Sequence, residues 1–288
     1  MQRRRRRKMS EKNLTFQYCD QLVREFEEVL ENPIISKSSV YYTGVDLGTA
    51  CVVLAVLDEN YKPVAGAYQY ADVVRDGMVV DYIGAIGIVK GLKQQLEEKL
   101  GTELIYAAAA IPPGTDELDS GAIKNVVKAA GFELTSVRDE PTAANSVLRI
   151  ENGAVVDIGG GTTGISILKD GKVVYVADEP TGGTHFSLVI SGAYKMPFAD
   201  AEVYKRDAGN HAELLPVVKP VVEKVSSIIN QHIKGHDVRE ISLVGGTCCL
   251  SGIEKIIEKQ TGIFTHKPQN PMFVTPLGIA LGCTMECE

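Results

Sequence analysis

One segment of this chain occurs twice, and the duplication limits the folds that the chain can adopt. Residues 45–57 have the sequence VDLGTACVVLAVL, and residues 156–168, 111 positions later, have the sequence VDIGGGTTGISIL. In both copies an apolar stretch reaches an aspartate, a glycine turn follows, and a second apolar stretch leads away. This pattern predicts that a whole α/β half has been duplicated.

The elements expected around the two copies alternate between strands and helices. Almost unbroken apolar runs predict strands that are buried on both faces of a sheet. Helices are expected where apolar residues recur at helical spacing. Strands are predicted within residues 41–49, 50–58, 63–70, 105–111, 153–156, 165–168 and 240–244, and an extended piece at 72–80. Helices are predicted at 82–100, 119–130, 184–194, 215–233, from about 251, and at 276–283. This order predicts two α/β halves, each with a five-stranded mixed sheet and helices on both faces.

Three regions follow from this order. Residues 1–39 are expected to form an Arg-rich leader and an amphipathic helix at 14–31, which ends before Pro33. Such a helix packs against its own domain or docks on a partner. Residues 40–150 are expected to form the first half, with a small insert at about 61–106. Residues 151–288 are expected to form the second half, whose last helix crosses back toward the first.

Composition excludes several classes of protein. The 288 residues are 44% hydrophobic and 23% charged, as in globular proteins, and no apolar run is long enough to span a bilayer. The net charge is −7, and without Arg3–Arg7 and Lys8 it would be −13, which argues against a nucleic-acid partner. Met9 follows this basic run as a candidate start. With no signal peptide, we expect a cytoplasmic protein.

The six cysteines do not have the spacing of a zinc site. Reduced thiols are therefore expected, and the neighbours Cys248 and Cys249, or Cys283 and Cys287, are candidate redox pairs.

The duplicated turns predict a phosphate site. Small residues allow successive backbone N–H groups to converge on an anion. An aspartate beside a phosphate needs a cation, and Mg²⁺ accepts carboxylates directly or through its bound waters. Two such turns that face each other would hold a polyphosphate with Mg²⁺ between them. A third glycine turn, Gly245–Gly246–Thr247, follows a predicted strand, where ligands bind in α/β sheets.

These segments resemble the motifs of the actin/Hsp70/sugar-kinase superfamily of ATPases. Residues 45–50 resemble its first phosphate motif, residues 156–163 the second, and 244–247 the adenosine motif. EPTAAN at 140–145 and PLGIALG at 276–282 resemble the two connecting motifs. EPTAAN and AIPPGT, at 110–115, are similar to the Hsp70 and bacterial actin-like branches. The best match is the Hsp70-like family encoded with the ethanolamine-utilisation systems of bacterial microcompartments. The resemblance implies duplicated ribonuclease-H-like halves.

The resemblance also implies roles for individual residues. Asp46 and Asp157 would hold Mg²⁺ through water, and Glu140 would position the attacking water in an ATPase. The chemistry would require in-line placement of that water against the γ-phosphate, while the metal and backbone dipoles take up the developing charge. The residues expected to contact ATP or ADP are Gly48, Thr49, Gly159, Gly160, Gly161, Thr162, Gly182, Gly183, Glu202, Lys205, Gly245, Gly246 and Thr247. Arg206 belongs to the same ExxKR pattern as Glu202 and Lys205.

Three departures from the family pattern have consequences. Gly164 stands where relatives have an aspartate, and no lysine of the insert matches the one that Hsp70 uses beside the γ-phosphate. Only about 60 residues separate Gly183 from Gly245, so the lobe that caps adenine in Hsp70, its subdomain IIB, is expected to be reduced or absent. We expect weak nucleotide binding and slow hydrolysis.

The functional expectation is an actin-like ATP-binding protein that acts as a chaperone-like assembly or reactivation factor. Its expected partners are ethanolamine-utilisation enzymes or microcompartment shell proteins. One alternative is a scaffold that binds nucleotide without hydrolysing it. A second is a small-molecule kinase, which the small insert disfavours.

Overall fold

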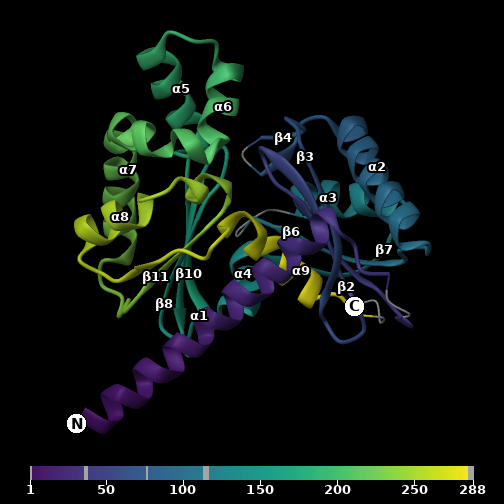
Figure 1. Ribbon diagram of the computed structural model, residues 1–288, viewed down its shortest axis with the longest axis horizontal. Helices are drawn as coiled ribbons and strands as arrows, with labels where there is room; N and C mark the ends of the chain where they lie inside the picture. Colours follow the sequence, from purple (N-terminus) through teal and green to yellow (C-terminus); the bar gives the residue numbers. More distant parts are fainter. Residues whose placement is uncertain (1, 36–37, 76, 113–116, 285–288) are drawn as a thin grey trace.

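Two five-stranded mixed sheets of the same topology form the body of the protein (Figure 1). The structure is a computed structural model that describes residues 2–35, 38–75, 77–112 and 117–284, with side chains from residue 16 onward except at 117–119. The strand orders are β3-β2-β1-β6-β7 and β10-β9-β8-β11-β12. The predicted fold class and its duplication are therefore confirmed.

The first sheet mixes antiparallel and parallel strands, and its first glycine turn connects β1 to β2. β2 (Cys51–Leu57) runs antiparallel to both of its neighbours, β1 (Tyr42–Leu47) and β3 (Pro63–Tyr70). β6 (Tyr106–Ile111) and β7 (Glu133–Asp139) run parallel to β1. A short hairpin, β4 (Val74–Arg75) with β5 (Met78–Val79), replaces the extended piece expected there. Helices α2 (Tyr82–Leu100) and α3 (Glu117–Ala129) cover one face through a shared hydrophobic cluster.

The second sheet repeats this arrangement. β8 (Gly153–Ile158), β9 (Thr163–Lys169) and β10 (Lys172–Glu179) are antiparallel, while β11 (Ile241–Val244) and β12 (Thr265–His266) are parallel to β8. Its outer face is covered by α5 (Gly183–Tyr194), α7 (His211–Ile233) and α8 (Ile253–Thr261).

The chain between Gly183 and β11 contains only helices and the loops that connect them. It forms α5, α6 (Phe198–Arg206), the short helix η1 (Ala208–Asn210) and α7. Residues 183–240 are all described and contain no strand. A small α/β lobe is therefore absent from this segment, as the sequence predicted.

A third hydrophobic cluster lies between the two sheets. It contains α4 (Glu140–Leu148) and α9 (Val274–Leu281), together with residues of both sheets. The helices approach so closely that a Cβ at Gly278 of α9 would lie 1.9 Å from the Ala143 carbonyl oxygen. A Cβ at Gly44 of β1 would lie 2.4 Å from the Pro276 carbonyl oxygen. Glycines at these crossings permit backbone contact between the two halves.

The N-terminal helix α1 (Gln2–Glu31) touches both halves (Figure 1). Phe26 is fully buried against β3, where a Cβ at Gly66 would lie 2.4 Å from its ring. Toward the second half, Asp20 accepts a hydrogen bond from the Gln269 N–H at 3.1 Å, and Glu27 accepts one from Asn270 Nδ2 at 2.7 Å. Within the described residues this helix thus packs on its own chain.

Some sequence features lie beyond the described part of the chain. Residues 113–115 of the AIPPGT segment and Cys287 fall outside it, and the Arg3–Lys8 side chains are likewise not described. The other five cysteines are free thiols. Among the described helices, none combines the length and the apolar character that crossing a bilayer requires.

The α4–α9 crossing generates a stability prediction. Gly278→Ala should lower the free energy of unfolding by about 3 kcal/mol, because the added methyl meets backbone atoms that cannot move aside. Gly87→Ala is the matched control, since nothing lies within 4 Å of its Cβ position on α2, and it should stabilise by about 0.5–1 kcal/mol. Urea unfolding measures both, and a near-neutral Gly278→Ala would contradict the close packing.

Candidate functional site

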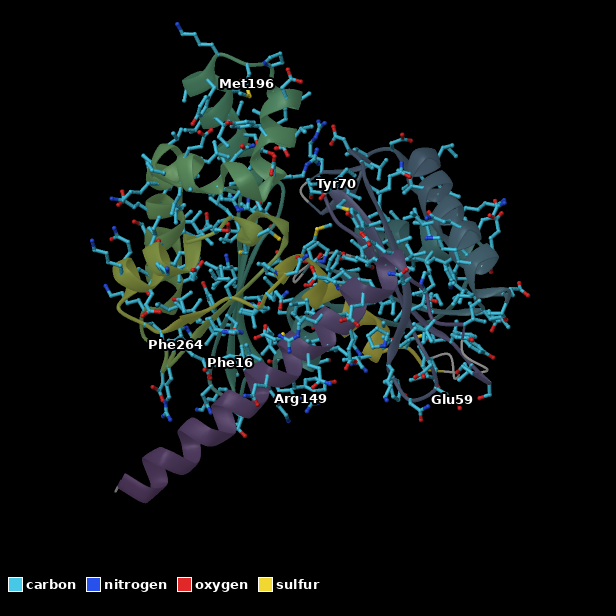
Figure 2. All side chains as sticks on the ribbon, viewed as in Figure 1. Phe16, Glu59, Tyr70, Arg149, Met196 and Phe264 are labelled. Carbon is cyan, nitrogen blue, oxygen red and sulfur yellow. The ribbon has the colours of Figure 1, made fainter. Side chains whose placement is uncertain are left out.

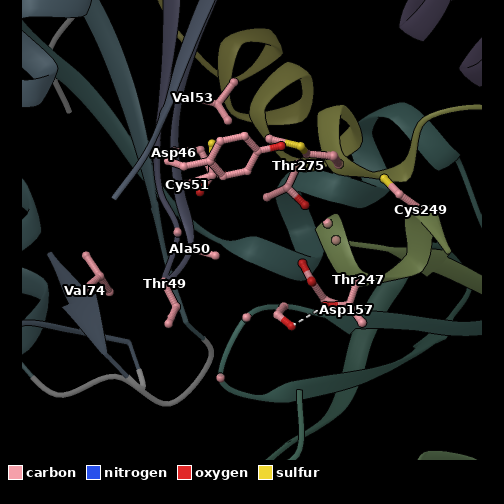
Figure 3. Close-up of a pocket in the computed structure, with 18 of the residues that line it drawn as sticks. Asp46, Thr49, Ala50, Cys51, Val53, Val74, Asp157, Thr247, Cys249 and Thr275 are labelled. Atoms are coloured by element: carbon pink, nitrogen blue, oxygen red, sulfur yellow. Dashed lines mark hydrogen bonds between the residues drawn. The ribbon is translucent and has the colours of Figure 1, made fainter. Parts of the chain in front are cut away.

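A cleft of about 1370 Å³ lies between the two halves (Figure 3). Its walls include the β1–β2 and β8–β9 turns, the start of α4, part of α6 and the loop after β11. The sequence-predicted residues that line it are Asp46, Gly48, Thr49, Glu140, Asp157, Gly159, Gly160, Gly161, Thr162, Glu202, Lys205, Gly245, Gly246 and Thr247.

Gly182 and Gly183 lie behind this wall. The Gly183 N–H donates to the Gly159 carbonyl at 2.9 Å, and a Cβ at Gly182 would lie 2.7 Å from Thr162 N. A Cβ at Gly183 would lie 2.5 Å from Thr247 Oγ1. These two glycines let the start of α5 pack against the β8–β9 turn.

The two duplicated turns have matching backbone geometry. In the first, the Gly48 N–H donates to the Cys51 carbonyl at 3.1 Å, and in the second the Gly159 N–H donates to the Thr162 carbonyl at 3.0 Å. A Cβ at Gly160 would lie 2.9 Å from the Ala50 side chain, so the turns of the two halves approach each other directly.

Asp46 and Asp157 occupy equivalent positions near the ends of β1 and β8. Both side chains are partly buried. Loss of hydration, followed by the charge of Asp157, raises the pKa of Asp46 to about 7. Loss of hydration and the charge of Asp178 raise the pKa of Asp157 to about 6, although the Thr275 hydroxyl partly opposes this. The two carboxylates are therefore close enough to repel.

Glu140 is the first residue of α4 and adds a third carboxylate. The N-cap is Asp139, whose side chain accepts a hydrogen bond from the Thr142 N–H at 2.9 Å. Loss of hydration, then the charges of Asp157, Asp46 and Asp178, raises the pKa of Glu140 well above its ordinary value. Three carboxylates from both halves thus face one space.

Lys205 and Glu202 form a network at the α5–α6 wall. Lys205 Nζ lies 2.9 Å from Glu202 Oε1, and it donates to the Gly183 carbonyl at 3.0 Å and to Ser187 Oγ at 2.8 Å. Burial lowers the pKa of Lys205, while Glu202 opposes the shift. Thr247 Oγ1 donates to the Gly159 carbonyl at 2.8 Å and ties the third glycine turn to the second.

Two side chains that the sequence analysis missed belong to this cleft. Tyr70 lies at the end of β3 (Figure 2), and the Arg206 guanidinium is 3.9 Å from its ring centre. This contact joins the two halves at the cleft. Asp178, on β10, lines the cleft near Glu140. No strand was predicted at β10, and the apolar run at 173–177 was the missed signal. Among the described residues, the lysine that lines the cleft is Lys205, and none comes from residues 61–106.

The carboxylates do not form a direct metal cage. In the part of the chain that the structure describes, no group of three His, Cys, Asp or Glu side chains is placed to hold a metal ion directly. The arrangement suits a cation that keeps its water shell, as Mg²⁺ commonly does.

Paired sheets of identical order and a cleft between two glycine turns define an actin-like protein. The MreB/Mbl protein family model matches residues 52–198, and the model of the type IV pilus assembly protein PilM matches residues 142–273. The fold is similar to MreB5 of Spiroplasma citri, solved bound to AMPPNP, with a TM-score of 0.70 at 18% identity over 85% of this chain and 96% of that chain.

Two further comparisons identify the family. The ethanolamine utilization protein EutJ of Salmonella typhimurium is 47% identical over 240 residues, which are 83% of this chain and 84% of that protein. The crystal structure of EutJ from Carboxydothermus hydrogenoformans has a TM-score of 0.88 and 47% identity, over 92% of this chain and 98% of that chain. The chain belongs to the EutJ family.

The raised pKa of Asp46 generates a pH prediction. An acid whose pKa rises on folding binds its proton more tightly in the folded state, so it costs stability as pH rises from about 4 through 7. Asp46→Asn should therefore raise the free energy of unfolding by about 2 kcal/mol at pH 8 and by little at pH 4. Urea unfolding at both pH values measures this, and an equal effect at both would contradict the raised pKa of Asp46.

Proposed function

We propose that this chain binds ATP or ADP with Mg²⁺ in the cleft between its halves. The observation that supports this most strongly is the group of three mutually repelling carboxylates, Asp46, Glu140 and Asp157, between two glycine turns. Such an arrangement costs free energy without a cation, and Mg²⁺ with an attached polyphosphate would offset both the repulsion and the lost hydration.

Each part of the cleft has a proposed role in binding. Asp46 and Asp157 would accept hydrogen bonds from waters on Mg²⁺. The turns at 48–50 and 159–162 would surround the phosphates with backbone N–H groups and threonine hydroxyls. The wall formed by Glu202, Lys205 and the turn at 245–247 would contact the nucleoside. Gly182 and Gly183 would support the second turn from behind.

The same geometry supports slow hydrolysis. Glu140 is positioned by the start of α4 and could orient a water against the γ-phosphate, which is the main protein task in phosphoryl transfer. The cleft lysine is Lys205, and its ammonium is already held by Glu202, Ser187 and Gly183. No further lysine is found among the described lining residues. Less charge stabilisation is therefore available to a transition state than in Hsp70, which uses a lysine beside the γ-phosphate.

We further propose a chaperone-like role in ethanolamine utilisation. The EutJ relatives are named ethanolamine utilization proteins. In the actin-like arrangement, a nucleotide in the cleft can bias the rotation of one half against the other. Enzymes or shell proteins of a microcompartment are the proposed partners, and the cytoplasm the proposed location. The alternative is a nucleotide-binding scaffold without turnover, which the engaged state of Lys205 favours.

Nucleotide binding has a direct thermodynamic test. Mg-ATP at about 100 times its Kd should stabilise the protein by about 2.7 kcal/mol. Thermal unfolding with 5 mM Mg-ATP, with ATP plus EDTA, and with Mg²⁺ alone should show the largest shift for Mg-ATP. Asp157→Asn should remove the Mg²⁺-dependent part, whereas Asp170→Asn, in the β9–β10 turn, should retain it. No shift of the wild type with Mg-ATP would refute nucleotide binding.

Phosphate release separates the ATPase from the scaffold. Under multiple-turnover conditions, the ATPase releases many phosphates per protein molecule, and Glu140→Gln should slow release by about 10- to 100-fold with little change in the Kd for Mg-ATP. A wild type that binds Mg-ATP but releases less than one equivalent is the scaffold.

A further inference from the structure

Three residues of the second sheet lie in one row across neighbouring strands. Asp157 on β8 is paired with Gly164 on β9, and Gly164 is paired with Asp178 on β10. Residues that are directly opposite in adjacent strands project from the same face of a sheet. All three line the cleft, so the row faces the space between the halves.

Gly164 makes a notch between two aspartates. Adjacent strands are about 4.8 Å apart, so the backbones of Asp157 and Asp178 are separated by roughly 10 Å. A Cβ at Gly164 would lie 3.9 Å from Asp178 Oδ1 and 3.9 Å from Asp157 Cβ. The Asp178 carboxylate therefore borders the space that a side chain at position 164 would enter, and that space has no backbone obstruction.

The charge of Asp178 acts on the other cleft carboxylates. After lost hydration, Asp178 is the charge that raises the pKa of Asp157, and it is one of those that raise the pKa of Glu140. Asp178 is thus electrically part of the cluster, although it comes from an edge strand. The cluster then contains four carboxylates. The fourth negative charge raises the electrostatic cost of the cluster in the absence of a cation.

We propose that Asp178 is a positioning residue for the hydrated Mg²⁺ of the nucleotide site, supplied by β10 across the notch at Gly164. This inference rests on the proposed function. Asp178 would supply the carboxylate that relatives have at position 164, where this chain has glycine. A cation that keeps its waters needs outer oxygens to accept from them, and Asp157 and Asp178 offer these from opposite sides of the notch.

The test compares binding with and without the metal. Isothermal titration would measure the Kd of ATP in excess Mg²⁺ and in EDTA for the wild type, Asp178→Asn and Asp178→Ser. Loss of an outer-shell carboxylate should raise the Kd of Mg-ATP about tenfold. Metal-free ATP should bind as tightly as before or more tightly, because a negative charge near the phosphates has been removed. A structural defect would weaken both ligands equally.

A rescue variant moves the carboxylate back to position 164. Because the Cβ position at Gly164 has only ordinary contacts, Gly164→Asp combined with Asp178→Asn should fold and should restore the Kd of Mg-ATP to within about threefold of the wild type. The charge-matched control Asp170→Asn changes the same hairpin at its turn, away from the row, and should bind both ligands as the wild type does.

The outcomes separate this inference from the proposed function. If the wild type binds neither ligand, nucleotide binding itself fails, and the role of Asp178 fails with it. If the wild type binds Mg-ATP and Asp178→Asn binds it equally well, only the role of Asp178 is rejected. Equal weakening with and without Mg²⁺, or no rescue by a folded Gly164→Asp double variant, also rejects that role.

Discussion

The gathering of partly buried carboxylates where the two halves meet is the constraint on which the proposed site depends. Duplicating one α/β half places two equivalent strand ends, and hence Asp46 and Asp157, on either side of a single cleft. Helix α4 adds Glu140 from a third direction. Taking these carboxylates out of water beside one another costs free energy. In the proposed function, a bound cation offsets that cost.

Close backbone packing lets the two halves share this site. Gly278 and Gly44 allow α9 to lie against α4 and β1, and Gly182 and Gly183 allow α5 to support the second glycine turn. Helix α1 adds contacts to both halves, and Glu27, Leu30 and Glu31 at its C-terminal end line the cleft. The helical segment between α5 and α7 leaves one side of the cleft without a capping lobe, where Arg206 instead meets Tyr70.

The sequence predicted most of the strands that contain a run of apolar residues. β3 was expected at 63–70 and has those bounds, and the duplicated strands were recognised because apolar residues run unbroken. Strands β7 and β10 were missed. In β7 the apolar residues Leu134 and Val137 are separated by polar ones, and in β10 the apolar run at 173–177 was not recognised as the third strand of its sheet. Helix α7 was expected from 215, beside Pro216, yet it begins at His211 and contains that proline. No helix was predicted at 198–206, where the structure has α6.

The same limits apply to the cleft. Motif positions close to the repeated turns could be named in advance, since sequence spacing fixes them. Asp178 and Tyr70 could not be named in advance, because strand pairing and contact between the halves bring them to the cleft.

The most direct test of the central claim is a crystal structure of the protein with Mg-AMPPNP. The account predicts the triphosphate between the turns at 48–50 and 159–162, with a hydrated ion whose waters contact both Asp46 and Asp157. A nucleotide bound elsewhere, or an ion reached by only one of these aspartates, would contradict it.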